Sequence, residues 1–512
     1  MFTRKALLET AFLVGLRARL DPDPLDGDYA SLMRQVQDIA SRPSYRELIA
    51  RDEAALLLYA GTYAALRLCG HDDPTFRHLI QQASTGGYAT VFERIPYRQL
   101  DLLHTLEMCQ IGNSLPTVDQ VLPLTLLCNR PNVIKLADRD VYAITHTIFY
   151  ATDFGLRQPR WPAGTGVGDI VELLEALLVL TRARKDADLV GEVLCCLLCL
   201  GVKEGDSVDQ AWDFLASVQE KDGRVDGPPG IVHTQITEGD SDYHSWATGY
   251  HTTIVAALAG ILHRSPLTCD PGPAVPPSRS GTAQTDTIHR AVVWLCRASV
   301  QHPPGTGLPA AAAGAYGAAA IGDPRLARPA LAHFATQLAD ADQGLWQEHG
   351  MEVAGEFAAG LRTLGITCPS LDSFLQATSD IISSLPEVPP EAAANVHRLS
   401  GLGLLAPERA TALTARRTPQ PVSPEHSASL LPGLVRNYDL SRIACVVREL
   451  IAAGWAEHRI ARDAVAFLTA QQNPDGAFGY PAHDDPATRG RVQLSWTQSI
   501  VTALAELGKV DS

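Results

Sequence analysis

The densest group of polar and aromatic residues in the chain lies between residues 238 and 251. Its ionisable members include Asp240, Asp242, His244, Tyr250 and His251. On a helix, His244 and His251 would share a face but stand about 10 Å apart along the axis. They could not ligate one ion together from this helix, although one could bind a metal while the other contacts a substrate. Asp240 or Asp242 would cap the start of the same helix.

Two further segments combine histidine with acidic or phenolic side chains at helical spacing. His146, Tyr150 and Asp153 recur at intervals that place them on one face of a helix. Earlier in the chain, Asp101 and His104 are separated by about one helical turn. Both segments are embedded in apolar sequence, where an unpaired polar group is costly and therefore needs a partner.

The three segments fall on helices of the same parity, so an arrangement of alternating inner and outer helices would bring them to one cavity. Imidazoles and a carboxylate from separate helices form a ligand set for Zn²⁺ or Fe²⁺. The same groups could instead relay protons, because histidine titrates near neutral pH. Separately hydrogen-bonded core histidines are the structural alternative. The predicted metal ligands are His104, His146, Asp153, His244 and His251, and the predicted catalytic residues are Asp240, Asp242, Tyr150 and Tyr250.

Helical periodicity dominates the elements that would carry these residues. Leu174, Leu177 and Leu178, for example, recur at helical spacing, and glycine and proline interrupt the chain at intervals typical of short loops. Strand-like alternation is nearly absent. The sequence therefore predicts an all-α fold.

A proline-rich stretch divides the chain. Residues 265–285 contain five prolines, among them Pro266 and Pro277, and this composition does not sustain a helix. The predicted domains are an N-terminal helical-repeat domain over 1–264, a linker over 265–285 and a C-terminal helical-repeat domain over 286–512. Because the C-terminal domain lacks the histidine-rich segments, we expect the active site and its main polar cavity in the N-terminal domain.

The two halves repeat a helix, an Asp-Gly turn and a second helix. Phe214-Leu215 precedes Gln219 and Asp222-Gly223, and the same offsets relate Phe467-Leu468 to Gln472 and Asp475-Gly476. In the helix that follows, Tyr250-His251 pairs with Trp496-Thr497, so Thr497 takes the position of His251. Recurring units of this kind bury their apolar faces against neighbouring units.

The segment Gln472-Asn-Pro-Asp-Gly-Ala-Phe478 resembles the glutamine–tryptophan repeat of squalene–hopene cyclase and other class II terpenoid cyclases. The resemblance implies an α/α toroid in each half, in which helical hairpins close into a ring around a central cavity. This superfamily also includes protein prenyltransferase β subunits and lanthipeptide cyclases. Its terpenoid cyclases protonate their substrate with an Asp-x-Asp-Asp motif, for which this chain has Asp240-Ser-Asp242-Tyr243.

Charge and composition limit the partners. The net charge of −15 at pH 7 argues against nucleic acid and anionic membranes, which attract basic surfaces. No apolar run reaches the length of about 18 residues that a membrane helix needs. Glu9, Arg17 and Arg19 interrupt the N-terminal apolar segment, which argues against a signal peptide. The 10 scattered cysteines are expected to be reduced thiols of a cytoplasmic protein.

Three functional hypotheses follow. The first is a biosynthetic enzyme of natural-product metabolism, a cyclase, lyase or oxidase, that acts on an apolar or peptidyl substrate over a His/Asp centre with or without a Zn or Fe ion. The second is a metal-free cyclase in which Asp240 or Asp242 donates the proton. The third is a helical-repeat scaffold that binds a partner without catalysis.

Overall fold

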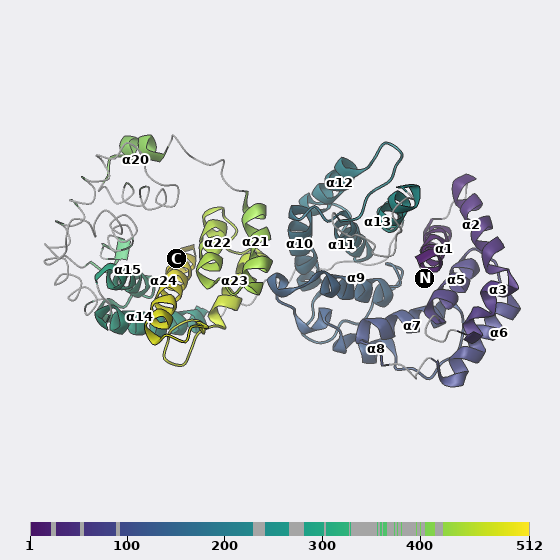
Figure 1. The fold of residues 1–512 in the computed structure, drawn as a ribbon, viewed down its shortest axis with the longest axis horizontal. Helices are drawn as coiled ribbons and strands as arrows, with labels where there is room; N and C mark the ends of the chain where they lie inside the picture. The colour runs from purple at the N-terminus through teal and green to yellow at the C-terminus, as the bar shows by residue number, and fades with distance from the viewer. Residues whose placement is uncertain are drawn as a thin grey trace. The chain divides into compact units, whose positions relative to one another are not determined.

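The computed structural model confirms the all-α class (Figure 1). It describes residues 2–21, 27–51, 56–88, 93–228, 241–265, 281–301, 304–326, 405–414 and 423–510, with isolated positions between 328 and 400. These ranges contain helices and loops but no strand. Within them, β-type pairing is confined to two isolated bridges, Gln219 with Val225 and Gln472 with Phe478.

Contacts between Cα atoms divide the chain between Pro276 and Pro277 into two compact units. The division falls within the predicted linker. Helix α13 ends at Arg264, at the predicted boundary. Helix α14 begins at Gly281, so residues 281–285 are helical and the predicted linker is too long at this end. The reason is that no proline follows Pro277 in this stretch.

Six helices of the first unit pack in a closed cycle, which we call the first ring. In order around the cycle, α1 packs on α5, α5 on α7, α7 on α9, α9 on α11, α11 on α13, and α13 on α1 (Figure 1). Their bounds are Phe2–Leu20 for α1, Leu56–Leu68 for α5, Pro96–Met108 for α7, Asp138–Thr152 for α9, Ala187–Cys199 for α11 and Ser241–Arg264 for α13.

The other helices of this unit pack against members of the ring. Helix α2 packs on α1 and α5, α6 on α5, α8 on α7, and α10 and α12 on α11. Their bounds are Gly27–Ala40 for α2, Pro74–Ala83 for α6, Val118–Val121 for α8, Val167–Ala183 for α10 and Asp206–Val218 for α12. Short helices α3 (Pro43–Arg46), α4 (Leu48–Arg51), η2 (Ser84–Tyr88), η3 (Leu122–Leu124), η4 (Leu127–Asn129) and η5 (Val133–Lys135) complete the unit.

The ring helix α11 is buried much more completely than its neighbour α12. Every residue of α11 is buried, and most are Leu, Val, Ala or Cys. In α12 the buried residues are Val208, Ala211 and Leu215, which form one apolar stripe. A helix that is surrounded on all sides accepts a charged residue only where a polar partner compensates the charge.

The second unit contains a comparable set of helices. Helices α14 and α15 pack on each other and on α24, and α22 packs on α21, α23 and α24. Their bounds are Gly281–Gln301 for α14, Pro304–Ala320 for α15, Pro407–Thr414 for α20, Pro424–Arg436 for α21, Leu440–Ala452 for α22, Arg459–Thr469 for α23 and Pro486–Val510 for α24.

The predicted repeat turns are confirmed in both units. Gly223 and Gly476 follow α12 and α23 and have φ angles of 90° and 101°, the left-handed region that favours glycine. In the first turn, Gln219 Nε2 donates to the carbonyl oxygen of Gly223 over 3.0 Å. In the second turn, Gln472 Nε2 donates to the carbonyl oxygen of Gly476 over 3.2 Å.

The register of the helix after this turn differs from the sequence prediction. The backbone N–H of Val225 donates to Thr253 Oγ1 over 3.0 Å, and that of Phe478 donates to Thr497 Oγ1 over 3.0 Å. Thr497 is therefore the counterpart of Thr253 and not of His251. The apolar residues later in the helix suggested the wrong register, because only the threonine is fixed by the turn.

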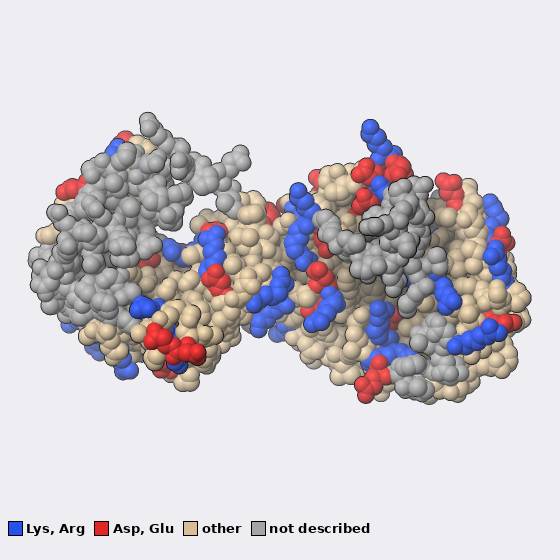
Figure 2. Space-filling model, viewed as in Figure 1, with Lys and Arg blue, Asp and Glu red and all other residues tan. Residues whose placement is uncertain are grey.

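Acidic and basic side chains lie interspersed over the described parts of the face in Figure 2. The described parts of this face therefore carry no extended basic surface, in keeping with the net charge of −15. Among the described helices, none combines the length and apolarity required to cross a lipid bilayer.

The two turn glycines provide a matched test of the repeat. Alanine at Gly223 would strain φ without meeting any atom, whereas alanine at Gly476 would also overlap the carbonyl oxygen of Arg290. We expect Gly223→Ala to lower the free energy of unfolding by about 1–2 kcal/mol and Gly476→Ala to lower it by roughly 1–3 kcal/mol more. Urea unfolding followed by circular dichroism measures both, and equal losses would contradict the close approach of Arg290 to Gly476.

Candidate functional site

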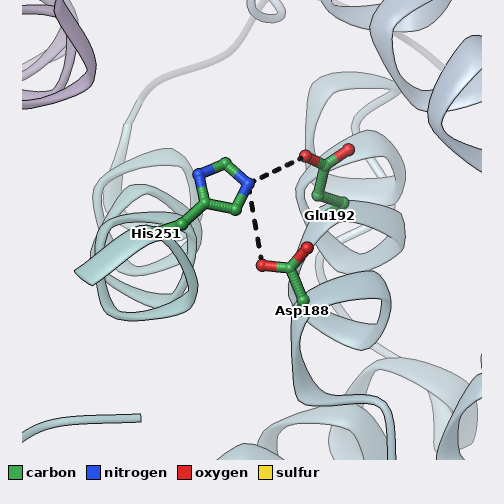
Figure 3. A group of neighbouring side chains, drawn as sticks. All are labelled: Asp188, Glu192 and His251. Carbon is green, nitrogen blue, oxygen red and sulfur yellow. Dashed lines mark ion pairs between the residues drawn. The ribbon is translucent and has the colours of Figure 1, made fainter. Parts of the chain in front are cut away.

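Asp188, Glu192 and His251 form a group that we call the carboxylate–imidazole cluster (Figure 3). His251 Nε2 lies 3.7 Å from Asp188 Oδ1 and 3.8 Å from Glu192 Oε1. One ligand-type atom from each residue lies within 4.8 Å of the other two. The cluster therefore joins a histidine of α13 to two carboxylates of α11.

The packing of α11 against α13 creates this arrangement. Asp188 and Glu192 are four residues apart on α11 and so share a face. A side chain on Gly191 would collide with Val255, and its absence lets α13 approach. Asp188 also lies in the first turn of α11, where the exposed N–H groups of a helix favour negative charge.

Hydroxyl groups from neighbouring helices hold the two carboxylates. Asp188 accepts hydrogen bonds from Tyr142 OH over 2.5 Å and from Thr252 Oγ1 over 2.9 Å. Glu192 accepts one from Thr145 Oγ1 over 2.5 Å. Burial raises the pKa of Glu192 to about 7, and the charge of Asp188 adds to the effect. Glu192 therefore exchanges its proton near neutral pH.

His251 is held on its other side by the first helix. Its Nδ1 lies 3.0 Å from Glu9 Oε2, and Glu9 also pairs with Lys5 over 3.2 Å. Burial favours a low pKa for His251, but Glu9 and Asp188 outweigh it and raise the pKa above its ordinary value. Burial likewise opposes ionisation of Glu9, but the hydrogen bond and charge of His251 lower the pKa of Glu9. The contact is an ion pair between α13 and α1.

His146 borders the cluster. Its Nδ1 donates to the carbonyl oxygen of Tyr142 over 2.8 Å and lies 3.6 Å from Glu192 Oε2. Burial lowers the pKa of His146 to about 4, so the ring is neutral at pH 7. His146 and His251 therefore approach opposite oxygens of one carboxylate, and the structure brings these two predicted residues together.

His104 and Asp153 form a separate group. His104 Nε2 donates to Asp153 Oδ1 over 2.8 Å, and Arg19 binds the same carboxylate through two nitrogens over 2.7 and 2.5 Å. His104 is buried, and its Nδ1 has no hydrogen-bond partner among the described residues. No ion pair joins Asp153 to the carboxylate–imidazole cluster in the part of the chain that the structure describes.

The prediction that Asp153 shares a helical face with His146 is wrong. Helix α9 ends at Thr152, and Asp153 adopts a left-handed conformation with a φ of 50°. The carboxylate is thereby directed to Arg19 and His104. Burial would raise the pKa of Asp153, but the hydrogen bonds from His104 and Arg19 lower it to about 2.

The remaining predicted residues have different outcomes. The Tyr150 ring centre lies 5.4 Å from that of His104 and 5.9 Å from that of His146, so Tyr150 stands between the two groups. Burial, followed by the charge of Asp101, raises the Tyr150 pKa well above its ordinary value. Tyr250 stacks on Trp246 at 4.9 Å. Asp240 and the side chains of Asp242 and His244 lie outside the described residues.

Sequence reasoning missed Asp188, Glu192 and Glu9. The signal for the first two was present, because two carboxylates four residues apart interrupt the otherwise apolar run from Ala187 to Leu200. Glu9 carried no comparable signal. It is a single acidic residue in an amphipathic helix, and only the closure of the ring brings it to His251.

The second unit provides an internal comparison for the cluster. Asp186 and Asp439 cap α11 and α22 in the same manner, and the separation of 253 residues (439 − 186 = 253) also relates Gln219 to Gln472. By this register, Asp188 corresponds to Ser441 and Glu192 to Cys445. The Thr253–Thr497 match similarly places Ser495 opposite His251. The second unit thus has neutral side chains at all three positions.

We expect the contacts of Asp153 with Arg19 and His104 to make a pH-dependent contribution to stability. The folded-state pKa of about 2 lies below the ordinary value of 3.8, so the contribution is complete above about pH 5 and is lost as the pH falls toward 2. We expect Asp153→Asn, which tolerates the left-handed backbone, to lower the free energy of unfolding by roughly 2 kcal/mol at pH 7. Urea titrations should show the difference from wild type shrinking between pH 5 and pH 3, and a constant difference would contradict this assignment.

The first unit coincides with the region that one family model matches. The model, described as a domain of unknown function (DUF6895), matches residues 1–261, which include the whole carboxylate–imidazole cluster together with Glu9 and His146. No curated protein and no solved structure matches the chain. Because the matched region covers just over half of the 512 residues, the chain belongs to the DUF6895 family.

Proposed function

We propose that the first unit is the catalytic part of a biosynthetic enzyme and that its reacting centre is the carboxylate–imidazole cluster. The observation that carries this proposal is the burial of Asp188 and Glu192, each 3% exposed, on a helix that is otherwise apolar. Two neighbouring buried carboxylates cost several kcal/mol unless they are compensated. Perturbed ionisable groups of this kind concentrate at functional sites.

The internal comparison supports the same proposal. Ser441 and Cys445 occupy the positions of Asp188 and Glu192 in the second unit, where α22 packs on α24 as α11 packs on α13. This helix pair therefore forms without carboxylates at these two positions. The fold alone therefore does not explain why Asp188 and Glu192 are present, whereas a chemical role explains them.

Aromatic rings around His146 favour a substrate with apolar parts. The rings of Tyr97, Tyr142, Phe149 and Tyr150 lie 5.9–6.3 Å from the imidazole ring, measured between centres. Such a surrounding suits an apolar or peptidyl small molecule better than a highly charged one. The closed cycle of six helices is in keeping with the α/α-toroid resemblance, and hence with natural-product metabolism as the setting.

The cluster can act in two ways on such a substrate. Glu192, whose pKa is about 7, can exchange a proton at neutral pH. Alternatively, the three residues can bind a cation that supplies the missing positive charge. For an acid-initiated reaction, Glu192 thus joins Asp240 and Asp242 as a candidate proton donor.

Metabolite profiling tests this proposal even though the substrate is unidentified. The purified full-length chain is incubated with small-molecule extracts, and mass spectrometry records the compounds that disappear or form. We expect Glu192→Gln to reduce turnover by at least about 100-fold, because the reacting centre loses an ionisable carboxylate. The helical circular dichroism of the variant should match that of wild type.

Cys445→Ala is the matched control, because Cys445 occupies the same position in the second unit. It should leave turnover unchanged. Equal turnover by wild type and Glu192→Gln would contradict the proposal and would favour a binding scaffold.

A further inference from the structure

We propose that the carboxylate–imidazole cluster binds one divalent transition-metal ion, Zn²⁺ or Fe²⁺, through His251 Nε2 and one oxygen each of Asp188 and Glu192. This inference rests on the proposed function, since it takes the same cluster as the reacting centre. It goes further by assigning a cofactor class and a ligand to each position.

The distances between the candidate ligand atoms fit one ion. Bonds of about 2.0–2.2 Å in a tetrahedral arrangement place neighbouring ligand atoms roughly 3.4 Å apart. In the structure, His251 Nε2 lies 3.7 Å from Asp188 Oδ1 and 3.8 Å from Glu192 Oε1. Small side-chain rotations are enough to close these distances around an ion.

The orientation of His251 provides a second argument. Its Nδ1 is bound by Glu9 over 3.0 Å, and this contact directs Nε2 toward the two carboxylates. Histidine ligands in metal sites usually bind a carboxylate through the ring nitrogen that faces away from the metal. Glu9 is therefore a positioning residue, not a ligand, and Lys5 in turn holds Glu9 at 3.2 Å.

The carboxylates are oriented in the same way. Asp188 accepts hydrogen bonds from Tyr142 and Thr252, and Glu192 accepts one from Thr145. The hydroxyls of Tyr142 and Thr145 bind the carboxylate oxygens that are not the proposed ligand atoms, and that of Thr252 binds Asp188 Oδ1 itself, so that both carboxylate rotamers are fixed. Such outer contacts keep ligating carboxylates in place and account for much of the affinity of metal sites.

The donor set selects the class of metal. One imidazole with two carboxylates offers nitrogen and oxygen donors, which suit Zn²⁺ and Fe²⁺, whereas Ca²⁺ and Mg²⁺ take oxygen ligands. Two thiols of α11 are directed elsewhere. Cys195 Sγ donates to the carbonyl oxygen of Val255, and Cys196 Sγ donates to that of Thr145. The site is therefore distinct from a thiolate zinc site.

Metal titration of the full-length chain tests the inference. The protein is first treated with a chelator and then titrated with Co²⁺, whose visible absorption reports ligand number and geometry. Zn²⁺ should displace Co²⁺ with a stoichiometry of one ion per chain, and excess Mg²⁺ should not. A wild-type chain that binds no Co²⁺ or Zn²⁺ would overturn the inference.

Variants assign the ion to this cluster. Asp188→Asn, Glu192→Gln and His251→Ala should each abolish the Co²⁺ spectrum. Ser441→Ala and Cys445→Ala, at the matched positions of the second unit, should bind as wild type does. Retention of the spectrum by His251→Ala would place the ion elsewhere and overturn the assignment.

Glu9→Ala should weaken metal affinity about 10- to 100-fold. Glu9→Gln should recover part of the loss, because its amide oxygen can still accept from Nδ1. This rescue separates a positioning role from a general effect on folding, and equal losses in both variants would contradict the role of Glu9.

Chelation separates this inference from the proposed function. If turnover needs Glu192 and also needs the ion, both stand. If turnover needs Glu192 but survives removal of metal, the role of the ion as cofactor is overturned and the proposed enzyme acts by acid–base chemistry. If metal binds but Glu192→Gln turns over as wild type does, the proposed function is overturned.

Discussion

The burial of two carboxylates on α11 is the constraint on which the first ring depends. Asp188 and Glu192 are almost completely buried on a helix that is surrounded by its neighbours, so their charges must be met within the protein. Tyr142 on α9 and His251 on α13 meet them from opposite sides of α11. The same contacts that compensate the charge therefore also link three ring helices.

A comparison of the two units shows which part of this arrangement belongs to the fold. The caps at Asp186 and Asp439 and the glycine turns are common to both units, because they satisfy backbone groups that every such helix pair exposes. At the positions of Asp188 and Glu192, in contrast, the second unit has the neutral residues Ser441 and Cys445. The shared features hold the scaffold together, and the features found in one unit carry the chemistry that we propose for it.

The fold was predictable because its signals are local. Helical periodicity and the Asp-Gly turns depend on residues close in sequence, and both were confirmed. The site was harder, because it joins positions far apart in the chain. His146 and His251 were predicted as site residues because they are polar residues at helical spacing, whereas Glu192 lies in an apolar run that is typical of a buried core. Asp153 was misplaced because periodicity says nothing about where a helix ends, and a left-handed residue turns its side chain away from the expected face.

The contact between Glu9 and His251 links the chemistry to the closure of the ring. Glu9 lies on the first helix of the cycle and His251 on the last, and the contact between these two helices closes the cycle. Until then, His251 lacks the partner that directs Nε2 toward the two carboxylates. A partly folded chain would thus present carboxylates and imidazole without their mutual orientation. The geometry of the proposed site is thus a property of the complete ring, and this dependence explains why no single segment of the sequence could reveal it.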